Sequence, residues 1–177
     1  MEERIINEEN VSENEVDDYA VRVKAIILNS NDEILLAYSY GTYMFPGGHL
    51  EGDEPLVPGL NRELYEETGM DFELEKTDIK PFYSIVHYNR NYRNTGKVRK
   101  NIIYYFILKT DTTFDKAKKH LDEVESKGDF ELVYVPFDSI EDVLVDSIPD
   151  NEMNKIITEE MLEVINVVKT RTTIEFD

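Results

Sequence analysis

The chain is organised around one stretch, GGHLEGDEPLVPGLNRELYEETGM, which spans residues 47–70. A glycine-containing acidic turn comes first, two prolines follow, and a glutamate-rich segment ends on a glycine. The positions that define the pattern are Gly48, Glu54, Arg62, Glu63, Leu64, Glu66, Glu67, Gly69 and Met70. A pattern of this length is far more specific than a lone glycine-rich triplet.

The second half of this stretch predicts a helix that carries three carboxylates on one side. Residues 56–68 lack the alternation of a strand and end before Gly69, a common helix stop. At roughly 100° per residue, Glu63, Glu66 and Glu67 fall within an arc of about 100°. Like charges at these spacings destabilise a helix, so we expect a bound cation to compensate. Oxygen ligands without cysteine favour a hard divalent ion such as Mg²⁺ or Mn²⁺.

Other residues of the stretch support this interpretation. Arg62 lies one turn before Glu66 and can pair with it or with a carboxylate of the preceding loop. Leu60 and Leu64 face the other way and can seat the helix on a core. At Gly48 the backbone can approach a metal or a phosphate without interference from a Cβ atom. The alternative is a solvated acidic surface helix, which would explain a glutamate pair but not the complete pattern.

The start of the helix is the one irregular part of the pattern. Proline is tolerated only in a first helical turn, so the helix should begin near Pro55 to Pro58. Gly59 weakens that turn by about 1 kcal/mol relative to alanine. The glutamates lie beyond this region and should be undisturbed.

At these positions the stretch resembles the signature of the Nudix hydrolases, enzymes that cleave nucleoside diphosphates linked to another moiety. The resemblance covers residues 48–70 and implies an α/β (α+β) fold, a mixed β-sheet sandwiched between helices. It also implies that Glu63, Glu66 and Glu67 bind Mg²⁺ or Mn²⁺ together with the backbone carbonyl of Gly47, and that Arg62 orients a glutamate. We therefore expect a nucleotide pyrophosphatase that acts on a small-molecule nucleotide. The alternative is a catalytically silent nucleotide-binding sensor on the same fold, which would usually have lost one or more ligands.

Composition limits the remaining possibilities. The 177 residues suit one domain, and the formal charge of −19 argues against binding to nucleic acid or to an anionic membrane. No apolar run approaches a membrane span, and the first residues do not resemble a signal peptide. The absence of cysteine is compatible with a reducing cytoplasm, where we expect the protein to act. A homodimer is compatible with these observations.

The remainder of the chain predicts an acidic leader at residues 1–18, either disordered or forming an edge strand, and a single domain at residues 19–177. Expected strands are 19–28, 33–38, 71–75, 82–88, 101–108 and 130–135, and expected helices are 139–145 and 150–169. Residues 112–127 are charged and form a candidate helical insertion. In the last helix, residues 157–168 carry an apolar stripe that favours a core position over a partner surface.

A basic segment, residues 89–100, reverses the acidic character of the chain. Its cations are Arg90, Arg93, Lys97, Arg99 and Lys100, and it contains no acid. Beyond roughly 8 Å the negative field of the protein is screened by physiological salt, so nearby cations decide whether a phosphate binds. We expect one or more of these five cations, first of all Arg90 and Arg93, to contact substrate phosphate. Tyr88 or Tyr92 can stack on a base. The alternative is an exposed loop that pairs with acidic neighbours.

Hydrolysis of a phosphoanhydride also needs a carboxylate that accepts the proton of the attacking water. Glu63 is the candidate inside the pattern. Because Nudix enzymes differ in the position of this base, Glu123, Glu125 and Glu131 stay open as candidates outside the pattern.

Overall fold

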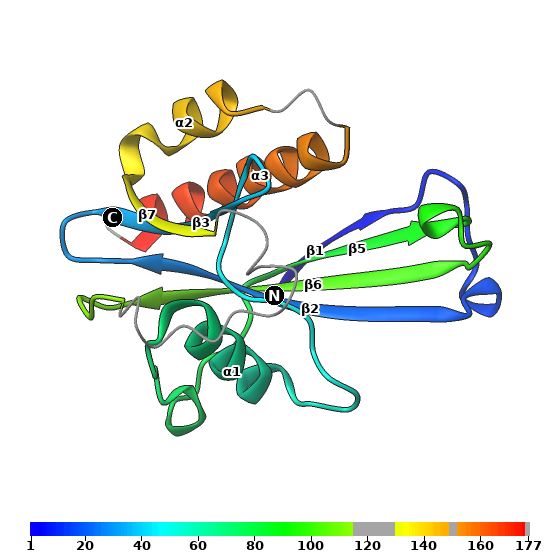
Figure 1. Ribbon diagram of the computed structural model, residues 1–177, viewed down its shortest axis with the longest axis horizontal. Coiled ribbons are helices and arrows are strands. Elements are labelled where there is room, and N and C mark those ends of the chain that lie inside the picture. Colours follow the sequence, from blue (N-terminus) through cyan, green and yellow to red (C-terminus); the bar gives the residue numbers. More distant parts are fainter. Residues whose placement is uncertain (115–129, 149–151, 176–177) are drawn as a thin grey trace. The chain divides into compact units, whose positions relative to one another are not determined.

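The computed structural model describes residues 1–114, 130–148 and 152–175 (Figure 1). These residues cluster into two units that interleave along the chain. The first contains Met1–Ile26, Gly47–Leu108 and residues 113–114, and the second contains Ile27–Pro46, Lys109–Thr112 and the described residues from 130 onward.

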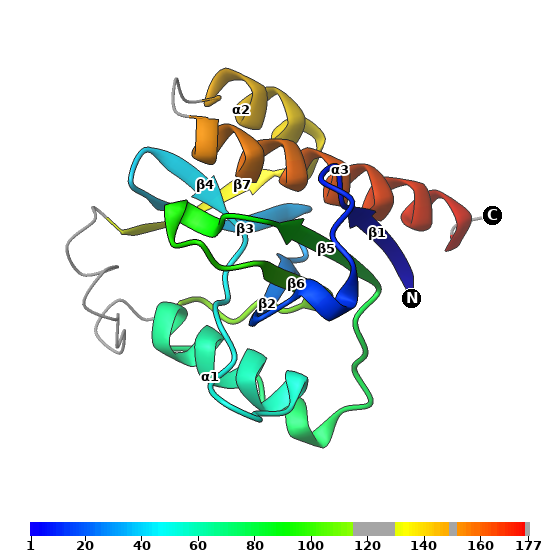
Figure 2. The same cartoon turned by 90° about the vertical axis from the view of Figure 1, so that its right-hand side faces the viewer.

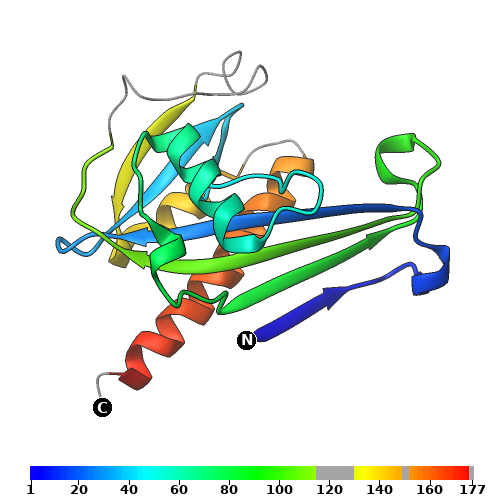
Figure 3. The ribbon, with the colours of Figure 1, turned by 90° about the horizontal axis from the view of Figure 1, so that it is seen from below.

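The first unit is built on a mixed sheet in the strand order β1-β5-β6-β2. Its strands are β1 (Glu2–Ile6), β5 (Tyr83–Asn89), β6 (Arg99–Lys109) and β2 (Asp18–Leu28), of which the last two continue into the second unit. Strand β1 pairs in parallel with β5, and β5 pairs antiparallel with β6 (Figure 3). Of the two expectations for the leader, the edge strand is therefore the one observed.

Helix α1 (Leu56–Thr68) carries the glutamates of the signature stretch. It begins directly after Pro55, and Gly69 ends it in the left-handed conformation, with its N–H donating to the carbonyl of Tyr65 at 2.9 Å. Leu60 and Leu64 are fully buried. The expected helix is confirmed, and its apolar side packs into the core as predicted.

The second unit centres on strand β3 (Glu33–Ser39). It pairs antiparallel with the end of β2, with β4 (Thr42–Met44) and with β7 (Glu131–Pro136). Helix α2 (Ile140–Asp146) packs on α3 (Glu152–Glu175), and α3 packs on β4 (Figure 2). The apolar stripe of α3 is buried at Met161, Val164, Ile165 and Val168, which confirms the predicted core role.

The expected strand at residues 71–75 is wrong. No strand forms there, and a short 3-10 helix, η2 (Leu74–Lys76), takes its place. The Asp71 carboxylate accepts the N–H of Glu73 at 2.9 Å, and Glu73 stands in the left-handed region at φ 47°. Such local side-chain bonding competes with an extended backbone. The charged segment at 112–127 falls almost entirely on residues 115–129, outside the described residues.

The short strand β4 was not predicted, although the chain contains its signal. Tyr40 and Gly41 both have positive φ, 49° and 77°, and Ser39 pairs with Thr42 across them. Two such residues between paired strands are typical of a two-residue hairpin turn. Among the described residues, no helix is long and apolar enough to cross a membrane.

A pair of leucine truncations in α1 tests this packing. We expect Leu64→Ala to lower the free energy of unfolding by about 2–5 kcal/mol, because a fully buried side chain leaves a cavity. Leu56→Ala, in the first turn of the same helix and only half-buried, serves as the matched control with a smaller loss. Denaturant unfolding measures both free energies. Equal losses in the two variants would contradict the packing of the Leu64 side of the helix on the core.

Candidate active site

Two glycines bring the signature loop into contact with its surroundings in the first unit. Gly47 has φ +118°, and a Cβ atom there would lie 2.3 Å from the carbonyl oxygen of Val23. A Cβ atom on Gly48 would lie 2.1 Å from Oε2 of Glu63. The carbonyl of Gly48 also accepts the N–H of Val23 at 3.0 Å. The loop therefore lies against β2 on one side and against a glutamate of α1 on the other, and both approaches need glycine.

The three glutamates of α1 have different surroundings. Glu67 is 4% exposed and accepts the N–H of Gly47 at 2.7 Å. Oε1 of Glu63 accepts Nη1 of Arg62 at 2.8 Å, and Oε2 of Glu66 accepts the same nitrogen at 3.2 Å. Burial raises the pKa of the Glu63 carboxyl. Glu63 and Glu66 thus bind the same nitrogen of Arg62, whereas Glu67 binds the backbone of the glycine loop.

Arg62 connects the helix to the loop. Its Nε and Nη2 donate to the two oxygens of Glu54 at 3.1 and 2.9 Å, and Nη2 also donates to the carbonyl of His49 at 2.9 Å. The bond from Arg62 lowers the pKa of Glu54, and the Arg62 pKa rises in turn. Arg62 therefore makes both of the contacts that the sequence left open, one to Glu66 and one to a loop carboxylate.

The oxygen donors of the site are suited to a divalent cation. Within residues 1–114, 130–148 and 152–175, no group of three or more His, Asp or Glu side chains already surrounds a common point. However, the carboxylates of Glu63 and Glu66 meet at the Arg62 guanidinium, and the Gly47 carbonyl accepts the ammonium of Lys24. Each of these hard oxygen donors therefore already binds a positive group. Their chemistry fits Mg²⁺ or Mn²⁺.

Two cations of this site, Arg22 and Lys24, were missed by the sequence analysis. Nε of Arg22 donates to Nε2 of His49 at 2.8 Å, and the two residues form an isolated β-bridge. Burial is the main cause that lowers the pKa of His49 to about 4, so its ring is neutral at pH 7. The cations that add to this effect are Arg22, Lys24, Arg99 and Arg93. Alternation along β2 was the available signal, because it places Arg22 and Lys24 on the face opposite Val23.

The predicted substrate-binding residues lie in and beside the loop between β5 and β6. The backbone N–H of Arg90 donates to Glu9 at 2.8 Å, and its guanidinium binds Glu15. The Tyr88 hydroxyl donates to Glu13. The guanidinium of Arg93 lies 5.2 Å from the centre of the Tyr92 ring. Arg90 and Tyr88 thus have acidic partners, as the alternative interpretation held, and phosphate contact by any of these residues stays a prediction.

Two of the candidate bases belong to the described residues. Glu63 lies in the site just described, whereas Glu131 is exposed on β7 in the second unit. Glu123 and Glu125 lie outside the described residues.

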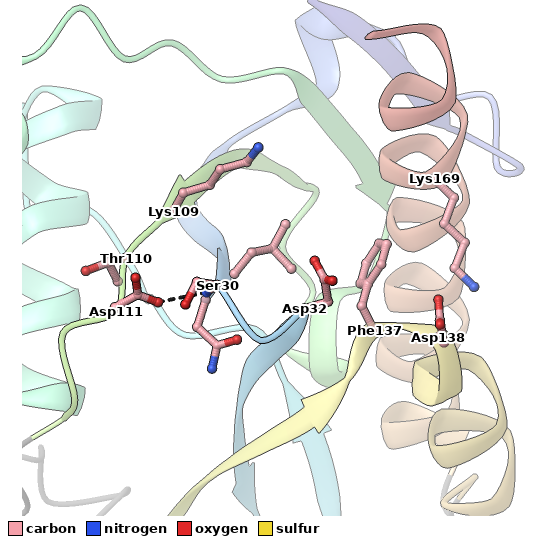
Figure 4. Close-up of a pocket in the computed structure, with 10 residues that line it drawn as sticks. Ser30, Asp32, Lys109, Thr110, Asp111, Phe137, Asp138 and Lys169 are labelled. Carbon is pink, nitrogen blue, oxygen red and sulfur yellow. Dashed lines mark hydrogen bonds between the residues drawn. The ribbon is translucent and has the colours of Figure 1, made fainter. Parts of the chain in front are cut away.

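A separate cavity of about 820 Å³ lies in the second unit (Figure 4). Its described lining residues are Leu28, Asn29, Ser30, Asp32, Lys109, Thr110, Asp111, Phe137, Asp138 and Lys169. None of them belongs to the signature stretch, so we do not place the candidate active site there.

Comparisons with known proteins give a relative in sequence and several in fold. A match to an RNA pyrophosphohydrolase of Pasteurella multocida (strain Pm70) has 34% identity over 76 residues, which are 42% of this chain and 36% of that protein. The chain therefore spans about a third of the length of this relative. Among solved structures, a MutT protein from Methanosarcina mazei Go1 has a TM-score of 0.53 at 19% identity, with 86% of this chain and 96% of that chain covered.

Two further structures share the fold. A MutT protein from Bacillus halodurans has a TM-score of 0.50 at 20% identity and covers 81% of this chain and 82% of its own. The dihydroneopterin triphosphate pyrophosphohydrolase of E. coli has a TM-score of 0.52 at 14% identity, with coverages of 82% and 98%. These likenesses confirm the expected mixed α+β fold. The NUDIX domain family matches residues 18–153, most of the chain. The chain therefore belongs to the Nudix family.

Proposed function

We propose that this protein is a divalent-cation-dependent pyrophosphohydrolase that cleaves a phosphoanhydride bond in a small nucleotide. The convergence of Glu63 and Glu66 on one nitrogen of Arg62, beside the Gly47-Gly48 loop, carries this proposal. Phosphoanhydride cleavage requires concentrated negative ligands for a cation next to a backbone that a phosphate can approach. The likeness to a protein named RNA pyrophosphohydrolase supports the reaction class.

Glu63, Glu66 and Glu67, with the Gly47 carbonyl, would hold Mg²⁺ or Mn²⁺. When bound, the ion supplies charge neutralisation and lowers the pKa of its bound water. Arg62 holds Glu54 through two hydrogen bonds and so keeps the loop and the helix in register. Glu63 is the carboxylate of the site that we assign as acceptor of the water proton.

Cations around His49 would bind the substrate phosphates. Arg22 and Lys24 contact the signature loop directly, and the Arg93 and Arg99 charges reach His49. In a chain of charge −19, such a local excess of cations is an expected feature of an anion site. We propose Arg93 for phosphate binding on this ground.

The alternative is a nucleotide-binding sensor without catalysis. Every position of the signature is occupied by the expected residue, and Glu63, Glu66 and Glu67 all take part in the described contacts. This favours an enzyme. We further propose that it acts in the cytoplasm on a free nucleotide, as a monomer or a homodimer.

A product assay tests the proposal. The protein is incubated with nucleoside triphosphates, nucleotide sugars, dinucleoside polyphosphates, coenzyme A and 5′-triphosphorylated RNA, and products are identified by mass. We expect release of a nucleoside monophosphate or of phosphate with Mg²⁺ and none with excess chelator. A sensor would bind a nucleotide and return it unchanged. Turnover that is equal with and without chelator would exclude the metal.

Neutralising one glutamate tests the ligand assignment. We expect Glu66→Gln to lower kcat at least about 10²-fold, because a cation ligand loses its charge. The fold should stay intact, since the side chain is 36% exposed. Glu75→Gln, an exposed glutamate outside the signature, is the control. Near-normal turnover by Glu66→Gln would remove this residue from the site.

A glycine pair in the loop tests the close approach of Glu63. We expect Gly48→Ala to lower kcat at least about tenfold, because the new Cβ atom displaces the Glu63 carboxylate that lies 2.1 Å from its position. In Gly52→Ala, a change in the same loop, the Cβ atom meets nothing within 4 Å, although the φ of +52° is unfavourable for alanine. We therefore expect this variant to lose some stability and to retain turnover. Equal turnover of the two variants would show that Glu63 need not stand where it does.

A further inference from the structure

The part of the acidic leader that follows β1, residues 7–18, lies against the basic segment, residues 89–100, which forms a hairpin between β5 and β6 (Figure 3). Arg90 is the centre of this contact. Its guanidinium binds both carboxylate oxygens of Glu15, one of them at 3.2 Å, and donates to the carbonyls of Glu9 and Asn10 at 3.2 Å each. Arginine also binds phosphate in this bidentate manner, through two oxygens of the ligand. Glu15 therefore occupies Arg90 as a phosphate would.

Two further cations of the basic hairpin each bind one carboxylate oxygen of the leader. Lys100 donates to Glu13 at 2.5 Å, and Arg99 donates to Asp18 at 2.6 Å. The backbone closes the contact, because the carbonyl of Val98 accepts the N–H of Asp18 at 3.2 Å. Three of the five cations in the hairpin are thus paired with leader carboxylates.

The leader is ordered for this contact by bonds of its own. The Asn7 side chain donates to and accepts from the backbone of Val11 at 2.8 Å, and Val11 is buried. Glu15 accepts the N–H of Ser12 at 2.8 Å. The bond from Arg90 is the main cause that lowers the pKa of Glu15 to about 2, so this carboxylate is ionised throughout the physiological range.

A chain of phosphodiesters binds protein mainly through cations that lie along its backbone, whereas a single nucleotide needs only the few cations at its phosphates. The basic hairpin would offer such a row, extending from the cations around His49, if Arg90 and Lys100 were available. The leader neutralises both. Arg22 and Lys24, in contrast, contact the signature loop itself.

We propose that Glu13 and Glu15 are specificity-determining residues, which occupy Lys100 and Arg90 as intramolecular substitutes for phosphate and thereby disfavour substrates that carry a nucleic-acid chain. This rests on the proposed function, because it restricts that site to small nucleotides. The proposed effect depends on two side-chain pairs in one unit of the protein and concerns the binding of a nucleic-acid chain. A binding measurement can therefore test it, and no turnover has to be measured.

The probe is a single-stranded RNA decamer with a 5′-hydroxyl and a 3′ fluorophore, which offers phosphodiesters but no phosphoanhydride to cleave. Anisotropy titrations with Mg²⁺ compare the full-length protein with Glu13→Gln/Glu15→Gln. We expect about tenfold tighter binding by the variant at low salt. The dependence of log K on log salt should become steeper by about 1.4, since each freed cation adds about 0.7 for a single strand. Hydrolysis of the small nucleotide should change less than about twofold.

Glu8→Gln/Glu75→Gln removes the same charge from two exposed positions and is the matched control. Equal RNA affinity and salt slope in the two double variants would overturn the proposal. The proposal requires the gain in RNA affinity to come from Arg90 and Lys100. A gain that persists after Arg90→Gln/Lys100→Gln is added to the double leader variant would therefore also overturn it. If the double leader variant does not fold, Glu13→Gln alone replaces it. This side chain is 57% exposed and takes no part in the Ser12–Glu15 contact, and its expected slope change is about 0.7.

The outcome is separable from that of the proposed function. An RNA gain without hydrolysis of any nucleotide would reject the pyrophosphohydrolase and leave the charge competition standing. Hydrolysis of small nucleotides without a gain in RNA affinity would reject the charge competition and leave the pyrophosphohydrolase standing.

Discussion

The arrangement of the candidate site depends on one guanidinium. Arg62 donates to Glu54, Glu63, Glu66 and the carbonyl of His49, and so holds three carboxylates and a loop around one positive charge. A half-buried carboxylate without such a partner is costly, because burial disfavours its ionised form. The raised pKa of Glu63 shows that burial outweighs even this partner. The positive charge of Arg62 therefore stabilises these carboxylates beside one another, and a bound divalent ion would act in the same direction.

A residue of low helix propensity in α1 allows the signature loop to approach the helix closely. Gly59 lies inside the helix, where glycine costs about 1 kcal/mol relative to alanine. A Cβ atom there would lie 2.1 Å from the Leu50 side chain and 2.9 Å from Oε2 of Glu54. The weak first turn noted in the sequence thus gives room to the loop that presents Glu54 to Arg62. A locally unfavourable residue is typical of a site where close approach decides the geometry.

Those parts of the fold that rest on short-range rules could be predicted from the sequence. The Gly69 stop and the helical period located α1 and its buried leucines. Alternation located β2, and a run of β-branched and aromatic residues located β6. The error at residues 71–75 came from turn chemistry, since Asp71 bonds the N–H of Glu73 and competes with an extended backbone. The pairing of Arg22 with His49 joins positions that are 27 residues apart, and that of Arg90 with Glu15 joins positions 75 apart. An acidic chain offers many partners for each arginine, so charge alone could not select them.

Net charge is accordingly a poor guide to what this protein binds. The value of −19 is a sum over the whole chain, and it does not show which charges neutralise one another at contact distance. Salt screens exposed charges beyond about 8 Å, so a phosphate at the signature loop is influenced mainly by Arg22, Lys24 and their immediate neighbours. The basic hairpin is the larger cluster of cations in the sequence, yet Glu13, Glu15 and Asp18 cancel most of it at contact distance. The contacts between individual side chains, several of them between segments remote in sequence, therefore say more about anion binding than the net charge does.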